Sequence, residues 1–364
     1  MTPDRNAVVI RRITDADRGP VVRVTSRVFR ETNAQKKDVF DEDFWTWQYA
    51  SGVADNMNIV AVDKSTGDIV GSYPNLLLPL HCFGQPGRAT ICQDLLIDPS
   101  YRLHGLFSRM GSFSEDLMRQ AGVELSYAFP NGRSLGGFLK KHHYELLAEV
   151  PLYVKPLSFR TLMSTKWGST LGAFGALPDL ALPLLRLPAP GNPYRLVPMP
   201  DHEVAAPIWA GFQDEHGVLL RRDPDFLRWR FYDRPNHPYQ GLLLKKGGEA
   251  AAYAIVRKGT LFGTDVGLLM DFASAPGGDD HLPALLGHVE RWAAGEGLGM
   301  LVFILLAKRA LRSRITRLRY VQVPSRLNPR KFNLTVRTNV EGLPLAKAYD
   351  PDNWFVTLAD WDVL

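Results

Sequence analysis

Two apolar runs, residues 91–97 and 125–129, flank a polar loop and a segment with the apolar spacing of a helix. The first run ends before Pro99 and the second before Pro130, and proline is typical of turns. Apolar side chains recur at helical spacing as far as Met118, which predicts a helix between the two runs. The order strand, loop, helix, strand restricts the chain to folds in which helices pack on a sheet.

The loop that precedes this helix has the composition of an anion-binding turn. A helix N-terminus presents backbone N–H groups without helical partners, and its dipole favours a negative charge. Gly105 lets a ligand approach the backbone closely, and Arg102 adds a positive charge. The loop lacks the Gly-Lys-Ser/Thr of a Walker loop and the three-glycine spacing of a dinucleotide site. The sequence therefore predicts that residues 102–107 hold a phosphate group.

Arg102 and Gly105 resemble the acetyl-CoA signature Arg/Gln-x-x-Gly-x-Gly/Ala of the Gcn5-related N-acetyltransferase (GNAT) superfamily. Phe107 departs from that pattern, because the family has Gly or Ala there. A basic turn without a ligand is the alternative. The resemblance implies acetyl-CoA or another acyl-CoA as co-substrate. It implies that the co-substrate is contacted by the first strand, by the loop with the start of its helix, and by residues after the second strand. These residues are Leu95, Leu96, Ile97, Arg102, Leu103, His104, Gly105, Leu106, Phe107, Asn131 and Ser134.

In such a site the pantetheine arm would pair like a strand with residues 95–97, and an amine would attack the thioester directly. Asp94 is the first candidate for the base, because burial within a strand raises the pKa of a carboxylate. A structural Asp bound to a neighbouring group is the alternative. His81 is the second candidate, and a lone His is commonly structural. The family's acid, a Tyr on the helix after Asn131, is replaced by Leu139. Water is then the proton source, or one of His142, His143 and Tyr144.

The second half of the chain resembles the first. Residues 223–229 match residues 41–47 in two Asp, one Phe and one Trp at a constant offset of 182. The expected hairpin, central strand and helix follow in the same order, which indicates a duplicated unit. The turn after the second central strand has no Arg-x-x-Gly, and it carries Asp279 and Asp280, which would repel a pyrophosphate. We therefore expect one acyl-CoA site, in the N-terminal half.

The expected fold class is α/β (α+β), with two tandem GNAT-like domains that each have a twisted, mixed but largely antiparallel sheet flanked by helices. A strand at residues 145–154 is expected to end the first domain, and residues 354–362 are expected to form a closing strand. The expected boundaries are residues 1–157 for the domain with the acyl-CoA site, 158–193 for a linker with a short amphipathic helix, and 194–364 for the degenerate domain.

The composition limits the cellular compartment and the classes of ligand that we expect for this chain. No apolar segment is long enough to span a bilayer, and the N-terminus lacks a signal-peptide core. Cys82 and Cys92 are expected to be buried thiols in a reduced cytoplasm, and no metal site is expected. The net charge is +5, with basic residues concentrated between 308 and 337. That segment is either a solvated face or a surface for an anionic ligand. The oligomeric state is not predicted.

The predicted function is N-acylation of a primary amine on a small polar acceptor such as an amino sugar or a sugar nucleotide. An amino acid or a natural-product amine is an alternative acceptor. A transferase that uses aminoacyl-tRNA, or an acyl-CoA-binding protein without activity, are alternatives of another class. Nucleic acid is not the expected partner, and RNA binding would show strong salt dependence.

Overall fold

The computed structural model describes residues 7–32, 41–50, 55–161, 179, 187, 193–236, 239–261, 263–277, 280–328, 330–341 and 345–361. Most of the predicted linker helix lies outside the described residues. The chain forms two compact units whose segments interleave along the sequence. Unit 1 comprises Met1–Glu149, Asp233–Asn236 and Lys331–Asp350. Unit 2 comprises Val150–Tyr232, His237–Arg330 and Pro351–Leu364.

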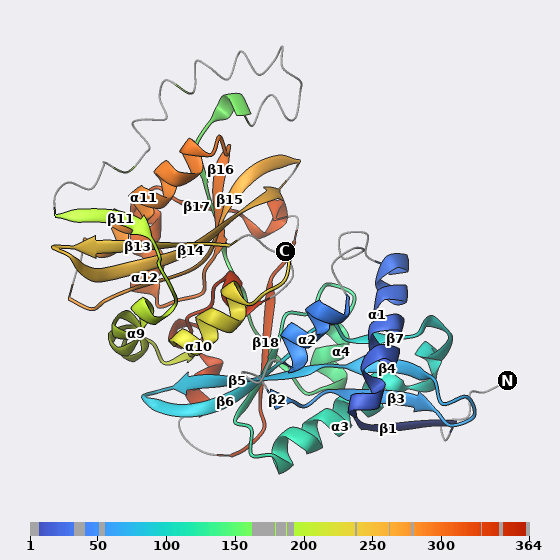
Figure 1. Ribbon diagram of the computed structural model, residues 1–364. Helices are drawn as coiled ribbons and strands as arrows, with labels where there is room; N and C mark the ends of the chain where they lie inside the picture. Colours follow the sequence, from blue (N-terminus) through green and yellow to red (C-terminus); the bar gives the residue numbers. More distant parts are fainter. Residues whose placement is uncertain are drawn as a thin grey trace. The chain divides into compact units, whose positions relative to one another are not determined.

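Unit 1 contains the predicted order of strand, loop, helix and strand, from β6 to β8 (Figure 1). Its elements are β1 (Val8–Arg12), α1 (Arg18–Thr32), α2 (Glu42–Ala50), β2 (Asp55–Asn56), β3 (Ile59–Asp63), β4 (Ile69–Tyr73), β5 (Asn75–Cys82), β6 (Gln85–Cys92), β7 (Leu96–Ile97), the 3-10 helix η4 (Pro99–His104), α3 (Leu106–Gln120), β8 (Leu125–Ala128), α4 (Leu135–Lys141), β9 (Glu145–Glu149) and β18 (Asn333–Thr338).

Two stretches of unit 1 each supply strands to two sheets. Pro74 separates β4 from β5. The run 91–97 is interrupted after Cys92, where Asp94 takes a left-handed φ of 55°. As a result β4 and β7 belong to the sheet β1-β3-β4-β7, whereas β5 and β6 belong to a sheet that continues β5-β6-β8-β18-β9. Bends of this kind allow one strand to serve two sheets.

Helix α3 packs its apolar face on the first of these sheets. Its buried positions include Leu106, Met110 and Met118, which follow the four-residue repeat of one helix face. Leu106 and Met110 belong to a core that also contains side chains of β1, β3 and β4. Each such side chain contributes about 1.5–3 kcal/mol when fully buried. This packing fixes the start of α3 beside β7.

The strand predicted at residues 145–154 is two strands that belong to different units. β9 pairs with β18 in unit 1, whereas β10 (Leu152–Pro156) pairs with β16 (Met300–Ile304) in unit 2. β18 lies between β8 and β9 and is antiparallel to both. A strand from near the end of the chain thus completes the sheet of unit 1. The apolar pattern could not predict this pairing, because it indicates burial but not the partner strand.

Unit 2 contains one twisted sheet with the order β11-β13-β14-β15-β16-β10-β17. β15 and β16 are parallel, and the other pairs are antiparallel. Besides β10 and β16, its elements include β11 (Tyr194–Pro198), α9 (Ala206–Phe212), the 3-10 helix η7 (Gln213–Glu215), β12 (Val218–Leu220), α10 (Pro224–Leu227), β13 (Gln240–Lys246), β14 (Glu249–Leu261), β15 (Thr264–Ser274), α11 (His281–Gly295), α12 (Arg309–Arg317) and β17 (Val321–Gln322).

The two halves share the helix cap that the sequence comparison aligned. The Asp41 carboxylate accepts a hydrogen bond from the Phe44 backbone N–H at 2.8 Å, and Asp223 accepts one from Phe226 at 3.0 Å. Unit 1 contains two largely antiparallel sheets rather than one, unit 2 contains one, and helices flank the sheets, so the predicted α/β (α+β) class is confirmed. The closing strand predicted at residues 354–362 is wrong. Its described part forms isolated bridges and a 3-10 turn over Leu358–Asp360.

Candidate active site

The parallel strands of unit 1 separate where β6 ends. β6 and β8 are paired from Ala89 and Leu125 to Cys92 and Ala128. Beyond that level β7 leaves for the other sheet and pairs with β4. The Asp98 N–H points toward β4, because it donates to the Val70 carbonyl at 2.9 Å. In a strand the N–H and C=O groups of successive residues point alternately to the two sides. The backbone groups of Leu95 and Ile97 therefore point away from β4. β7 is the edge strand of its sheet, so an extended ligand could add to it.

The predicted phosphate loop is a 3-10 helix followed by a left-handed glycine. The Asp98 carboxylate caps η4 by accepting a hydrogen bond from the Ser100 N–H at 2.9 Å. Gly105 has a φ of 67° and connects η4 to α3. A Cβ at Gly105 would meet no atom within 4 Å, so the backbone conformation alone calls for glycine there. The first-turn N–H groups of α3 belong to Leu106, Phe107 and Ser108.

Arg102 lies on η4 and is exposed, as expected of a side chain that contacts a soluble ligand. Leu103 and His104 lie on the same turn, and their side chains are outside the description. The loop thus has an exposed positive charge beside a helix N-terminus, which is the arrangement that the sequence predicted for a pyrophosphate.

Phe107, the departure from the family pattern, points into the protein. Its ring stacks on that of His142, with centroids 4.0 Å apart and planes at 16°. It also meets the edge of Phe138, at 6.0 Å. A Cβ on Gly137 would lie 2.6 Å from the Phe107 ring. Glycine at position 137 of α4 therefore makes room for an aromatic side chain where the family has a small one.

His142 joins three elements around the start of α3. Its Nε2 donates to the Phe107 carbonyl at 2.7 Å, and its Nδ1 lies 3.2 Å from the Tyr73 hydroxyl of β4. The ring is fully buried, and burial lowers the pKa of His142 to about 4. Arg337 of β18 donates to the His142 carbonyl at 2.8 Å and so caps the end of α4. The neutral imidazole holds α3, α4 and β4 together.

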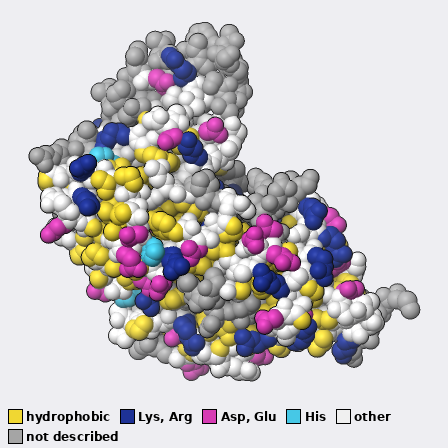
Figure 2. All heavy atoms as spheres, in the orientation of Figure 1, with side chains coloured by type: hydrophobic (Ala, Val, Ile, Leu, Met, Phe, Trp, Pro, Cys, Tyr) yellow, Lys and Arg dark blue, Asp and Glu magenta, His cyan; other side chains and the backbone are white. Residues whose placement is uncertain are grey.

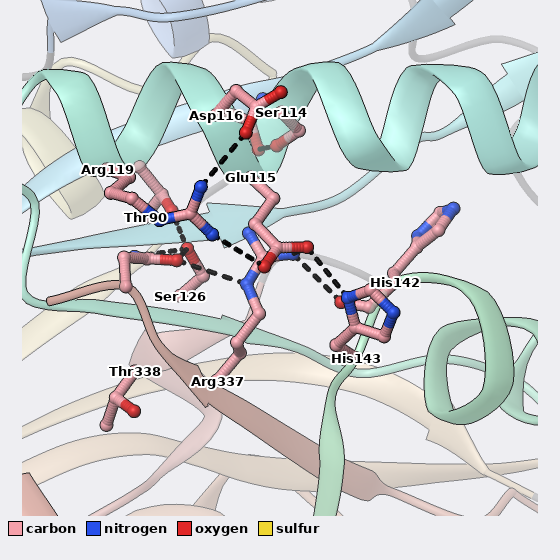
Figure 3. A network of polar contacts seen from close by, with 12 residues as sticks. Thr90, Ser114, Glu115, Asp116, Arg119, Ser126, His142, His143, Arg337 and Thr338 are labelled. Carbon is pink, nitrogen blue, oxygen red and sulfur yellow. Dashed lines mark hydrogen bonds and ion pairs between the residues drawn. The ribbon is translucent and has the colours of Figure 1, made fainter.

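Glu115 of α3 extends this network to the surface. Figure 3 shows its carboxylate directed at Arg119, His143 and Arg337. The distances are 2.9 Å to Arg119, 2.8 Å to His143 and 3.7 Å to Arg337. Arg337 is itself buried, so it is not part of a solvated basic face as one of the sequence interpretations assumed. Arg337 has a structural contact with α4 that its sequence position does not reveal.

Asn131 and Ser134 lie in the turn that leads into α4 and form hydrogen bonds within that turn. The Asn131 side-chain oxygen accepts hydrogen bonds from the N–H groups of Arg133 at 2.9 Å and Ser134 at 3.1 Å. The Ser134 hydroxyl lies 3.3 Å from both the backbone oxygen and the side-chain oxygen of Asn131. Both follow β8 directly, at the end where β8 and β7 have separated. A ligand contact from these residues stays a prediction.

The two candidate bases are far apart. Asp94 lies at the break between β6 and β7, half-buried, with its carboxylate 3.4 Å from the Tyr49 hydroxyl of α2. It is therefore not enclosed within a strand, as the sequence argument for it assumed. His81 pairs with Pro86 near the hairpin turn, and Asn75 pairs with Cys92 at the other end. Six residues of strand separate these levels, about 20 Å. The structure does not bring His81 to the loop.

The substitutes for the missing acid differ in exposure. Tyr144 is buried, and burial raises its pKa to about 12. His142 is buried and neutral, with both ring nitrogens in hydrogen bonds. His143 is exposed, has a φ of 55°, and pairs with Glu115. Sequence reasoning missed Tyr49, which approaches Asp94 from α2. No spacing rule connects these two residues, because α2 and the strand break meet only in the folded unit.

Both cysteines are buried thiols, as predicted, and burial raises the pKa of Cys82 to about 11 and that of Cys92 to about 12. Within the described ranges, no helix is long and apolar enough to cross a membrane. In the same part of the chain no group of three or more His, Cys, Asp or Glu could hold a metal ion.

Comparisons with known proteins agree with this geometry. Residues 9–147 match the family model of the acetyltransferase (GNAT) domain. No curated protein matches the sequence. A GCN5-related N-acetyltransferase from Anabaena variabilis is similar in structure, with a TM-score of 0.64 and 10% identity over 92% of this chain and 73% of the other.

Two further structures share the fold. A probable N-acyltransferase from Enterococcus faecalis has a TM-score of 0.58 and 12% identity over 91% of this chain and 72% of its own. N-myristoyltransferase from Saccharomyces cerevisiae, solved with bound myristoyl-CoA, has a TM-score of 0.58 and 12% identity over 94% and 85%. The match over residues 9–147, which include β7, η4 and α3, supports the predicted class of acyl-CoA-dependent N-acyltransferase.

Proposed function

We propose that the protein transfers an acyl group from acyl-CoA, acetyl-CoA first, to a primary amine of a small polar acceptor such as an amino sugar or a sugar nucleotide. The observation that carries the proposal is the strand break after Cys92, which leaves β7 as an edge strand directly before η4 and the start of α3. Pantetheine amides would pair with Leu95 and Ile97, and the pyrophosphate would lie at residues 102–107.

The chemistry needs few groups. The amine nitrogen attacks the thioester carbonyl carbon, a backbone N–H of β7 stabilises the oxyanion, and the C–S bond then breaks. Asp94 accepts the amine proton directly or through water, and Tyr49 positions its carboxylate. The thiolate leaves readily with a pKa near 8.5, so water can supply its proton.

A single donor site is supported by a comparison of the two units. Asp94 is five residues after Ala89, where β6 first pairs with β8, and Asp271 is five residues after Val266, where β15 first pairs with β16. Asp271 is fully buried and accepts hydrogen bonds from Thr357 at 2.7 Å and from Tyr253 at 3.1 Å. β16 pairs with β15 only from Val266 to Leu268, and beyond that level Thr357 and Tyr253 hold the buried Asp271 carboxylate, so it is not available as a base.

The mixed charges on the face shown in Figure 2 favour a small acceptor over RNA. On the face shown in Figure 2, acidic and basic side chains are interspersed over the part of unit 1 around α1 and α2. RNA binding calls for a continuous basic surface. An aminoacyl-tRNA substrate therefore gains no support from that face.

The test is release of free thiol from acyl-CoAs, from acetyl to myristoyl, in the presence of amines. The long chain is included because the yeast neighbour was solved with myristoyl-CoA. Thiol release that depends on an amino sugar, with the N-acylated product seen by mass spectrometry, is expected. Tight acyl-CoA binding without release for any amine would identify a binding protein instead. Absence of acyl-CoA binding would contradict the donor site itself.

A further inference from the structure

The position that the donor would take in unit 1 has a counterpart in unit 2. β15 and β16 form a parallel pair, as β6 and β8 do. α11 follows β15 as α3 follows β7, and α12 follows β16 as α4 follows β8. The end of β15, the start of α11 and the helix α12 therefore correspond to the three elements around the candidate donor site.

A cavity of about 670 Å³ lies at this position. Its lining includes Phe272 from the end of β15, Leu282 from the first turn of α11, and Leu311 from α12. All of its lining residues belong to unit 2. The volume is within the range of about 300–1,000 Å³ that small-molecule sites have.

One wall of the cavity is cationic. Lys308, Arg314 and Arg317 come from α12 and the residue that caps it, whereas Glu215 is the one carboxylate of the lining. Three positive charges and one negative charge leave an excess of two. Among the described residues, neither Lys308 nor Arg317 forms an ion pair with a carboxylate. The charges of Lys308 and Arg317 are therefore available to a ligand.

Another part of the lining is aromatic, and its rings are largely buried and held in place. The Phe212 ring meets the Phe355 ring edge-on, with centroids 4.9 Å apart, and Phe272 meets the same ring at 5.7 Å. Phe355 is fully buried, so it supports both rings from behind. A planar or aliphatic group could pack against these side chains.

We propose that unit 2 contains a second binding site, for an organic phosphate that carries an apolar or planar group. The phosphate would contact the cations of α12, and the apolar group would pack on Phe212 and Phe272. The excess of two positive charges matches a phosphate dianion better than a single carboxylate, and Arg binds phosphate oxygens in pairs. The sequence argument against a phosphate here considered only the turn after β15, whereas the cations come from α12.

The test is calorimetric titration of the full chain with ADP, without acyl donor or acceptor. To exclude the donor loop, it is done in an Arg102→Glu background. Arg317→Glu should weaken ADP binding at least about tenfold, because it replaces an attractive charge with a repulsive one. Arg309→Glu is the matched control, since Arg309 is exposed on the same helix and does not line the cavity. Its affinity for ADP should be unchanged.

Two further probes examine the ligand class. Pyrophosphate should bind more weakly than ADP if the aromatic wall contributes, and phenylacetate should bind more weakly than phenyl phosphate if the charge excess decides. Absence of ADP binding, or an affinity that Arg317→Glu leaves intact, would overturn the proposed site. Equal affinity for phenylacetate and phenyl phosphate would overturn the assignment to phosphates. These measurements do not depend on acyl transfer.

Discussion

The His142 imidazole stacks on the Phe107 ring and at the same time donates a hydrogen bond to the Phe107 carbonyl, at 2.7 Å. One buried side chain thus holds both the ring and the backbone of the second residue of α3. Because the N–H groups of this helix turn are the expected pyrophosphate ligands, the contact links the hydrophobic packing of α4 to the candidate donor site.

Gly111 has no side chain, and the His142 ring lies where its Cβ would be. A Cβ at Gly111 would overlap the His142 ring, so Gly111→Ala should lower the free energy of unfolding by about 1–3 kcal/mol. Gly136→Ala is the matched control, because its Cβ would meet nothing within 4 Å. It should be neutral or stabilise the helix by up to about 1 kcal/mol. Denaturant unfolding checks both, and equal midpoints would contradict the overlap.

His142 should make stability depend on pH. Its folded pKa of about 4 is below the ordinary value of 6.5, so between these values the unfolded chain binds more protons than the folded one. Stability should therefore fall as pH is lowered from about 6.5 to 4, by on the order of 3 kcal/mol. His142→Gln should remove this part of the slope, measured by urea unfolding at several pH values. His288, with a pKa also lowered to about 4 by burial, remains as background. An unchanged slope in the variant would show that His142 is not responsible.

Arg102→Glu should weaken CoA binding at least about tenfold, because a carboxylate would face the pyrophosphate. Arg309→Glu is the control, since Arg309 is exposed on α12 of unit 2, outside the matched residues 9–147. Calorimetry with CoA measures both. Equal affinities for the two variants would exclude residues 102–107 as the phosphate site.

Asp94→Asn should lower kcat by about 10²–10⁴-fold while CoA affinity stays near that of the wild type. Asn tolerates the left-handed φ of 55°, so the backbone is preserved. Tyr49→Phe removes the hydroxyl 3.4 Å from the carboxylate and should have a smaller effect. Thiol-release kinetics separate kcat from binding. A wild-type rate in Asp94→Asn would remove Asp94 from the reaction.

Asp360→Ala should strongly destabilise unit 2. The Asp360 carboxylate pairs with the fully buried guanidinium of Arg222, and Asp271 lies 3.6 Å from the same group. Removing one partner of a buried pair costs about 3–5 kcal/mol. Asp352→Ala breaks the more exposed pair with Arg312 and should cost no more than about 1 kcal/mol. Thermal unfolding compares the two, and similar melting temperatures would contradict the role given to Asp360.

Much of the fold could be predicted from local patterns. Apolar periodicity located α3 and β8, and the aspartates at positions 41 and 223, which the sequence comparison aligned, both cap a helix in the same way. Gly105 was predicted to let a ligand approach the backbone, which stays a prediction, and the structure adds that its left-handed φ favours glycine. These features depend on residues within one helix turn or one strand, which is the range over which sequence patterns act.

Other features were decided at long range. The break at Asp94 places β6 and β7 in different sheets. The residues around position 94 have no pattern that predicts this break. Arg337 contacts His142 across 195 residues of chain. β10 belongs to unit 2 and β18 to unit 1. Which strands pair is not encoded in the apolar alternation of each strand.

The sequence by itself determined many of the helices and strands and the position of the loop before α3, because each depends on local conformational preference and spacing, whereas the duplication stays a prediction. Only the tertiary structure decided that β7 is an edge strand beside the start of α3, and that Asp94 lies against Tyr49. It also decided that cations of α12 and the rings of Phe212 and Phe272 line one cavity. These relationships join residues distant in the chain, and their free energy comes from packing and from burial of charge.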